Sequence, residues 1–177
     1  PLLQGRAPVL DAHAPLRPQS AYGRTKAAGE WAVRAECPDT WIVRTAWLYG
    51  AAGPSFPKTM ARLARGRDSL AVVTDQVGQP TWTVDLAEGI VRIVEAGAPF
   101  GIWHGTNSGQ ASKFEQAEAL FADLGIDIAL EAVTSDAFPA PAPRPAYSVL
   151  SHAMWESAGI APLPPWRSVL AVVAHPD

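Results

Sequence analysis

Residues 20–50 read SAYGRTKAAGEWAVRAECPDTWIVRTAWLYG. Positions 21–36 contain no proline and follow Ser20, a residue type that caps helix N-termini, so a helix is predicted there. Positions 41–45 are rich in β-branched and aromatic residues and predict a buried strand, followed by a loop over 47–53. A helix that leads directly into a buried strand is typical of α/β folds.

The rest of the chain continues this alternation of helices and strands. Ser55 and Pro57 begin a helix that Gly66 ends, and a capping box at Ser112 and Glu115 begins another. The remaining predicted elements are strands at 70–73, 101–104 and 128–133, a helix over 84–96, and short helices near 153–158 and 166–173. This order predicts an α/β layer with parallel strand pairing.

Two of the predicted helices have apolar residues at helical spacing. Phe56, Met60 and Leu63 recur at i, i+4 and i+7, so they are expected to face the core. In the helix over 84–96 the residues expected to be buried are Ala87, Ile90, Val91 and Val94.

Composition excludes several classes of protein. The 177 residues are 48% hydrophobic and 18% charged, which suits one globular domain rather than a disordered chain. The net charge is −3 and no basic run occurs, which argues against nucleic-acid binding, and no apolar run is long enough for a membrane helix. The single cysteine, Cys37, forms no internal disulfide, and the four histidines lack metal-ligand spacing, so no metal is assigned. A cytoplasmic setting is expected.

The pattern with the clearest chemistry is Tyr22-Gly23-Arg24-Thr25-Lys26. Residues four apart share one face of a helix, so the phenol and the ammonium point into the same space. A nearby ammonium favours the phenolate, and such a tyrosine can exchange a proton with a carbonyl oxygen. The alternative is an ordinary surface pair with the tyrosine ring packed sideways. Small neighbours such as Gly23 and Ala27 favour the first interpretation, because they let a flat ligand approach closely.

Four segments, taken together, carry a family resemblance. They are residues 20–30 (SAYGRTKAAGE), 43–50 (VRTAWLYG), 75–81 (DQVGQPT) and 144–150 (RPAYSVL). In this order they resemble the dTDP-4-dehydrorhamnose reductase family of the extended short-chain dehydrogenase/reductases. The resemblance implies the remnant of a doubly wound, parallel-sheet (Rossmann-like) fold plus a smaller α/β substrate-binding portion.

The resemblance also implies roles for four residues. Tyr22 would protonate the C4 keto oxygen, and Lys26 would hold the nicotinamide ribose of NADPH or NADH and stabilise the phenolate. Trp47 would lie against the deoxysugar ring, and Arg144 would bind near the diphosphate of the nucleotide sugar. The family reaction forms dTDP-L-rhamnose. Two structural alternatives stay open: Trp47 as a packing aromatic, and Arg144 as a brace that bonds carbonyls of an extended segment.

Part of the family pattern is not found in the sequence. No glycine-rich phosphate loop occurs near the start, and no Ser or Thr stands convincingly on a strand before Tyr22. We therefore expect the C-terminal part of such an enzyme. Residues 1–50 would be the remainder of the cofactor domain, and residues 51–177 mostly substrate-binding, with some segments returning to the cofactor domain.

Such a part is expected to have little activity alone. Its open sheet edges would be covered by the missing N-terminal half or by a second copy in a homodimer. Two other functions stay open: a non-catalytic regulatory or binding subunit on the same scaffold, and a related 4-keto deoxysugar reductase of an antibiotic pathway.

Overall fold

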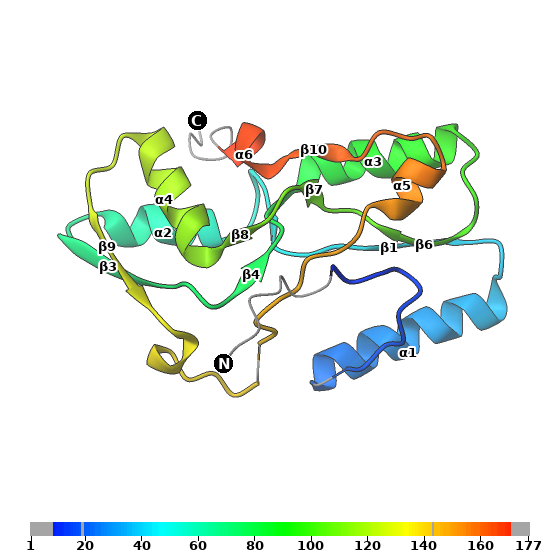
Figure 1. Cartoon of the computed structure of the whole chain (residues 1–177), viewed down its shortest axis with the longest axis horizontal. Coiled ribbons are helices and arrows are strands. Elements are labelled where there is room, and N and C mark those ends of the chain that lie inside the picture. The colour runs from blue at the N-terminus through cyan, green and yellow to red at the C-terminus, as the bar shows by residue number, and fades with distance from the viewer. Residues whose placement is uncertain (1–8, 19, 143, 171–177) are drawn as a thin grey trace.

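A computed structural model describes residues 9–18, 20–142 and 144–170 (Figure 1). The α-helices are α1 (Ala21–Glu36), α2 (Phe56–Ala64), α3 (Thr83–Glu95), α4 (Lys113–Leu124), α5 (Ala153–Ser157) and α6 (Trp166–Val169), with a 3-10 turn, η1 (Ser135–Ala137). The strands are β1 (Trp41–Arg44), β2 (Leu48–Tyr49), β3 (Ser69–Val73), β4 (Val77–Gly78), β5 (Thr81–Trp82), β6 (Gly101–His104), β7 (Asn107–Ser108), β8 (Ala111–Ser112), β9 (Ala129–Val133) and β10 (Leu163–Pro165).

Most of these strands pair in parallel, as the sequence predicts. The longer pairs are β1 with β6 and β3 with β9, and the short pairs β2–β5 and β10–β7 are parallel too. The pair β4–β8 is antiparallel. The α/β class with parallel pairing is therefore confirmed. The part of the predicted helix at 166–173 that follows Leu170 lies outside the described residues.

The molecule has two packed ends (Figure 1). At one end α2 and α4 pack beside β3 and β9, and the predicted core residues Phe56, Met60 and Leu63 lie against this cluster. At the other end α1 and α3 flank the β1–β6 pair on opposite sides (Figure 1). The core of this end is built around Trp103 and Trp155, whose rings meet edge to face with centroids 5.3 Å apart.

The predicted core face of α3 is wrong. Ala87, Ile90, Val91 and Val94 are exposed, and the residues that α3 buries are Asp85, Gly89 and Ile93. Asp85 accepts a hydrogen bond from the Asn107 amide, and Gly89 lets Leu163 and Trp155 approach the helix closely. The polar bond and the close approach orient the helix, although its apolar residues alone favour another face.

Candidate functional site

Tyr22 and Lys26 share one face of α1. Ser20 caps this helix by accepting a bond from the Gly23 N–H, and the Lys26 ammonium lies 5.5 Å from the centre of the Tyr22 ring. Tyr22 is 71% exposed, and neither residue lines the two cavities described below. The two side chains are thus neighbours on one face of α1, and that face is open to solvent.

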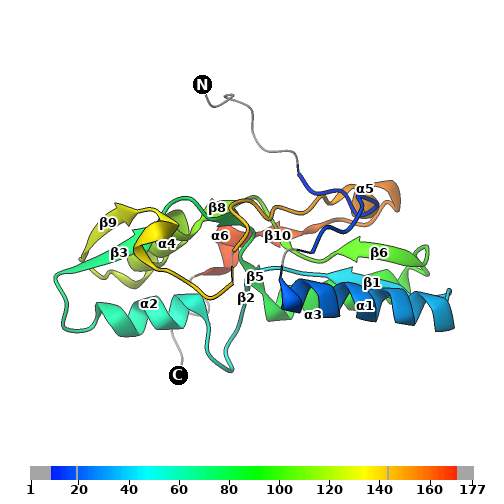
Figure 2. The ribbon, with the colours of Figure 1, turned by 90° about the horizontal axis from the view of Figure 1, so that it is seen from below.

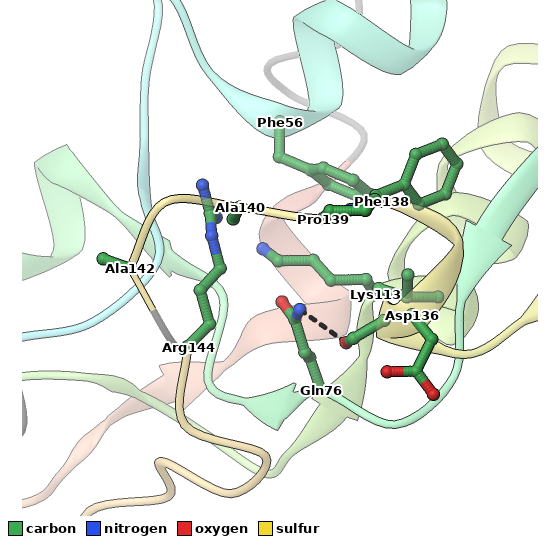
Figure 3. Close-up of a pocket in the computed structure, with 11 residues that line it drawn as sticks. Phe56, Gln76, Lys113, Asp136, Phe138, Pro139, Ala140, Ala142 and Arg144 are labelled. Atoms are coloured by element: carbon green, nitrogen blue, oxygen red, sulfur yellow. Dashed lines mark hydrogen bonds between the residues drawn. The ribbon is translucent and has the colours of Figure 1, made fainter.

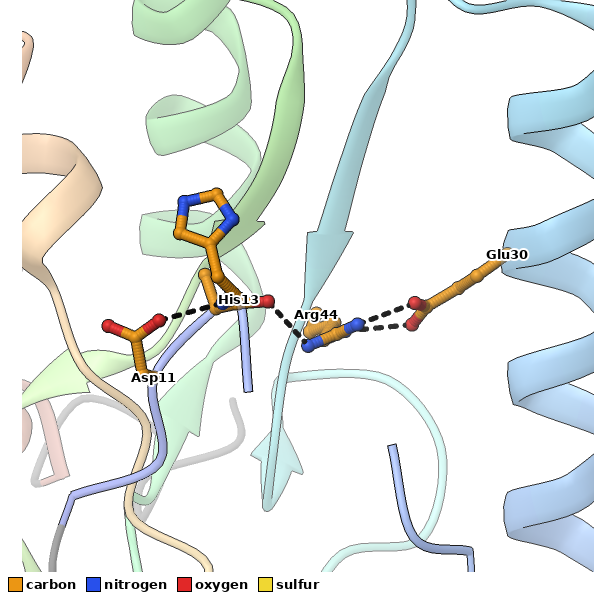
Figure 4. A network of polar contacts seen from close by, with 5 residues as sticks. Asp11, His13, Glu30 and Arg44 are labelled. Carbon is orange, nitrogen blue, oxygen red and sulfur yellow. Dashed lines mark hydrogen bonds and ion pairs between the residues drawn. The ribbon is translucent and has the colours of Figure 1, made fainter. Parts of the chain in front are cut away.

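The position of α1 depends on an ion pair with the neighbouring strand (Figure 4). Arg44 of β1 donates from Nε and Nη2 to the two carboxylate oxygens of Glu30, at 2.8 and 2.7 Å. Its Nη1 donates to the Ala12 carbonyl, at 3.3 Å. The Arg44 guanidinium thus bonds both a carboxylate and a backbone carbonyl. This one side chain joins the N-terminal segment, the strand and the helix that carries Tyr22.

Removing this ion pair is expected to loosen α1. In Glu30→Gln the Arg44 side chain, which is 18% exposed, loses its charged partner. We expect the free energy of unfolding to fall by about 1–3 kcal/mol, because a largely buried cation is left poorly compensated. Urea unfolding measures this change. The matched control is Glu36→Gln, an exposed residue at the end of the same helix, which should change stability by less than about 0.5 kcal/mol. Equal effects of the two substitutions would contradict the role of the ion pair.

The main cavity lies at the other end of the molecule and has a volume of about 590 Å³ (Figure 3). Its walls come from the start of α2, the end of β3, the start of α4, η1 and the segment that follows η1. Arg144 and Lys113 bring two cations into it, beside the aromatic rings of Phe56 and Phe138. An adjoining apolar hollow of about 360 Å³ lies between α2 and β3. Cations next to apolar walls suit a ligand with an anionic and an aromatic part.

The polar wall of the cavity is held by the Asp75–Gln76 segment. The Asp75 carboxylate accepts from the Ser135 N–H and hydroxyl, and the Gln76 amide donates to the Ser135 hydroxyl. These Ser135 bonds hold the pKa of Asp75 below its usual value. Asp75 thus fixes the start of η1 beside the cavity, and Gln76 faces the cavity itself.

Lys113 was not predicted as a site residue. Its ammonium lies 3.3 Å from the centre of the Trp47 ring and 4.4 Å from that of Phe56. Burial, and to a lesser extent the Arg144 charge, lower its pKa to about 7. In the sequence Lys113 is only the residue after the helix cap, and no local signal places an aromatic ring from another segment over it.

Trp47 has an unusual backbone. Its φ of 48° lies in the left-handed region that L-residues rarely adopt. A Cβ added to Gly78 would lie 2.5 Å from the Trp47 ring, so Gly78 makes room for this aromatic side chain. A strained backbone of this kind persists only where the surrounding packing holds it in place. Of the predicted site residues, Trp47 and Arg144 thus both lie near Lys113. Tyr22 and Lys26 lie away from them, on α1. The N-terminal end of α1 is directed toward residues 138–142 (Figures 1 and 2).

Residues 6–176 match the family model described as the RmlD substrate binding domain. The chain belongs to the dTDP-4-dehydrorhamnose reductase family. It is 49% identical over 155 residues to the dTDP-4-dehydrorhamnose reductase of Mycolicibacterium smegmatis. This match covers 86% of the chain and 47% of that protein. It is 48% identical over 174 residues to a probable dTDP-4,6-dihydroxy-2-methyloxan-3-one 4-ketoreductase of Streptomyces antibioticus. This match covers 97% of the chain and 58% of that protein.

A solved structure shares the fold. The crystal structure of dTDP-4-dehydrorhamnose reductase from Bacillus anthracis in complex with NADP superposes with a TM-score of 0.85 at 35% identity, covering 91% of this chain and 56% of that one. The resemblance to this family and to a Rossmann-like fold is confirmed. The chain spans about half the length of the relatives that it matches.

Two further features of the described residues bear on function. None of the helices there is both long and apolar enough to cross a membrane. In the same ranges, no group of three or more His, Cys, Asp or Glu side chains is placed to hold a metal ion.

Proposed function

We propose that this chain is the nucleotide-sugar-binding part of an NAD(P)H-dependent dTDP-4-dehydrorhamnose reductase. The whole enzyme reduces the 4-keto group of a dTDP-6-deoxysugar and forms dTDP-L-rhamnose. The observation that carries the proposal is the cavity where Arg144 and Lys113 converge, in a chain of this family. The diphosphate binds at Arg144, and the thymine lies in the adjoining apolar hollow between α2 and β3.

The strand pairing supports the proposed division into domains. In this proposal residues 1–50 are the last part of the cofactor domain, and residues 51–177 mostly bind the substrate. Support comes from β6, which belongs to the second range yet pairs along its whole length with β1 of the first. The segment around β6 is thus the part that returns to the cofactor domain.

Tyr22 and Lys26 carry out the chemistry in this proposal. The nicotinamide, when bound, supplies the hydride that C4 of the sugar receives. Tyr22 donates its phenolic proton to the C4 oxygen, so that the ketone becomes a secondary alcohol and the tyrosine a phenolate. Lys26 stabilises that phenolate and holds the nicotinamide ribose. Both side chains project from one exposed face of α1, which fits a ribose placed against that face.

Trp47 packs against the deoxysugar ring in this arrangement. The Trp47 ring contacts the ammonium of Lys113, which lines the cavity that holds the diphosphate, and the N-terminal end of α1 is directed toward that region (Figures 1 and 2). The sugar between these two groups would present its C4 oxygen to Tyr22.

A related 4-keto deoxysugar reductase is the second candidate. The 48% identity to the Streptomyces antibioticus 4-ketoreductase supports it. The two candidates share the nucleotide site and differ in the sugar, so turnover of a panel of dTDP-4-keto-6-deoxysugars by the whole enzyme separates them.

The nucleotide site is tested by Arg144→Met. We expect the affinity of this chain for dTDP-glucose to fall about tenfold or more, because a charge-assisted contact to the diphosphate is lost. Isothermal titration calorimetry measures the change. Arg65→Met, an exposed arginine after α2 outside the cavity, is the control and should bind as the wild type does. Unchanged affinity in Arg144→Met would show that Arg144 only braces its segment.

A further inference from the structure

Lys113 is a partly buried cation for which the described residues offer no carboxylate partner. The ion pairs among them join Arg44 to Glu30 and Arg167 to Asp123. The polar contact of the Lys113 ammonium is the Gln116 side-chain oxygen, at 3.4 Å. Asp136 lines the same cavity, but its carboxylate points away from the ammonium (Figure 3). Burying a cation in this way is unfavourable unless something compensates it.

The surroundings of Lys113 compensate it only in part. Lys113 is the first residue of α4, where the helix dipole disfavours a positive charge, and Arg144 adds a like charge nearby. The faces of Trp47 and Phe56 attract the ammonium, at 3.3 and 4.4 Å from the ring centres. Two cations held close together without a carboxylate are suited to an anion that carries more than one charge.

We propose that Lys113 is a second cationic ligand for the diphosphate of the nucleotide sugar, held in position by the rings of Trp47 and Phe56. The inference rests on the proposed function and deepens it. Arg144 and Lys113 reach the cavity from different segments, and both side chains extend into the same part of it (Figure 3). One contact to each phosphate would neutralise both cations.

Binding of a diphosphate to Lys113 should change the number of protons that the protein holds. Before a ligand binds, the pKa of Lys113 is about 7, so at pH 8 the amine is mostly neutral. A diphosphate stabilises the ammonium and raises this pKa, so binding takes up a proton from the buffer. The other charged groups near this cavity are Arg144, which opposes protonation, Asp136, whose carboxylate points away from the ammonium, and Asp75, whose carboxylate is bonded to Ser135. The bridging phosphates of dTDP-glucose do not titrate near this pH, so the uptake reports on the protein.

The experiment is calorimetric titration of the chain with dTDP-glucose at pH 8, in two buffers of different ionisation enthalpy. The wild type is expected to take up roughly half a proton or more, as a pKa moving upward from about 7 requires. Lys113→Met should lose about tenfold or more in affinity and lose the uptake. Lys113→Arg should keep most of the affinity but take up no proton, since arginine stays charged. If Lys113→Met does not fold, Lys113→Arg alone still tests the proposal.

Controls separate this inference from the proposed function. Lys58→Met removes a lysine that bonds loop carbonyls outside the cavity and should bind as the wild type does. Thymidine, which has no phosphate, should bind equally to the wild type and to Lys113→Met. If Arg144→Met weakens binding but Lys113→Met does not, or if Lys113→Arg takes up the same proton, the role of Lys113 is overturned and the nucleotide site stands. If the wild type does not bind dTDP-glucose, both the role of Lys113 and the proposed nucleotide site are wrong.

Discussion

In the whole enzyme of the proposed function, Tyr22→Phe is expected to lower kcat for 4-keto reduction by about 10²–10⁴-fold. Phenylalanine keeps the ring and removes only the hydroxyl that, in the proposed function, gives its proton to the C4 oxygen. Because Tyr22 is 71% exposed on α1 and does not line the main cavity, the substitution should leave the fold and that cavity unchanged. NADPH or NADH oxidation with a dTDP-4-keto-6-deoxysugar measures kcat, and KM should change little.

Tyr147→Phe is the matched control for Tyr22. The Tyr147 hydroxyl bonds the Gln110 side chain and lies outside the cavity lining, so its loss should leave kcat unchanged. Wild-type turnover by Tyr22→Phe would remove Tyr22 from its role. A full-length protein that binds dTDP-glucose but reduces no keto sugar would instead favour the non-catalytic binding subunit.

Gly78→Ala is expected to disturb both stability and binding. A methyl group there would lie 2.5 and 2.8 Å from two atoms of the rigid Trp47 ring and 2.9 Å from the Ser148 hydroxyl. The ring must shift, and its contact with the Lys113 ammonium shifts with it. We expect the free energy of unfolding to fall by about 1–3 kcal/mol, as for other overpacked sites, and dTDP-glucose to bind more weakly.

Gly29→Ala is the control for Gly78. Gly29 lies in α1, and a Cβ built there meets no atom within 4 Å. Alanine should therefore stabilise the helix by about 0.5–1 kcal/mol. If the packing at Gly78 matters, urea unfolding should show a lower free energy of unfolding for Gly78→Ala and a higher one for Gly29→Ala than for the wild type. A Gly78→Ala protein as stable as the wild type would show that Trp47 can move at little cost.

Several features of this protein can be predicted from the sequence because their causes are local. Ser20, Ser55 and Ser112 cap the helices that they were expected to cap, since a side-chain oxygen needs only the N–H groups of the next turn. The alternation of helices and strands likewise predicts the parallel α/β class. The i, i+4 spacing of Tyr22 and Lys26 brings them onto one helix face.

Other features depend on contacts between distant segments. The buried face of α3 is set by Asn107, Trp155 and Leu163, so its own apolar pattern predicts the wrong side. Lys113 becomes a candidate site residue only where Trp47 is packed over its ammonium. Side-chain type and spacing determine local structure because the interacting groups are neighbours in the chain. Burial, close approach and the pKa of Lys113 arise only when segments far apart in the sequence exclude water from the same place.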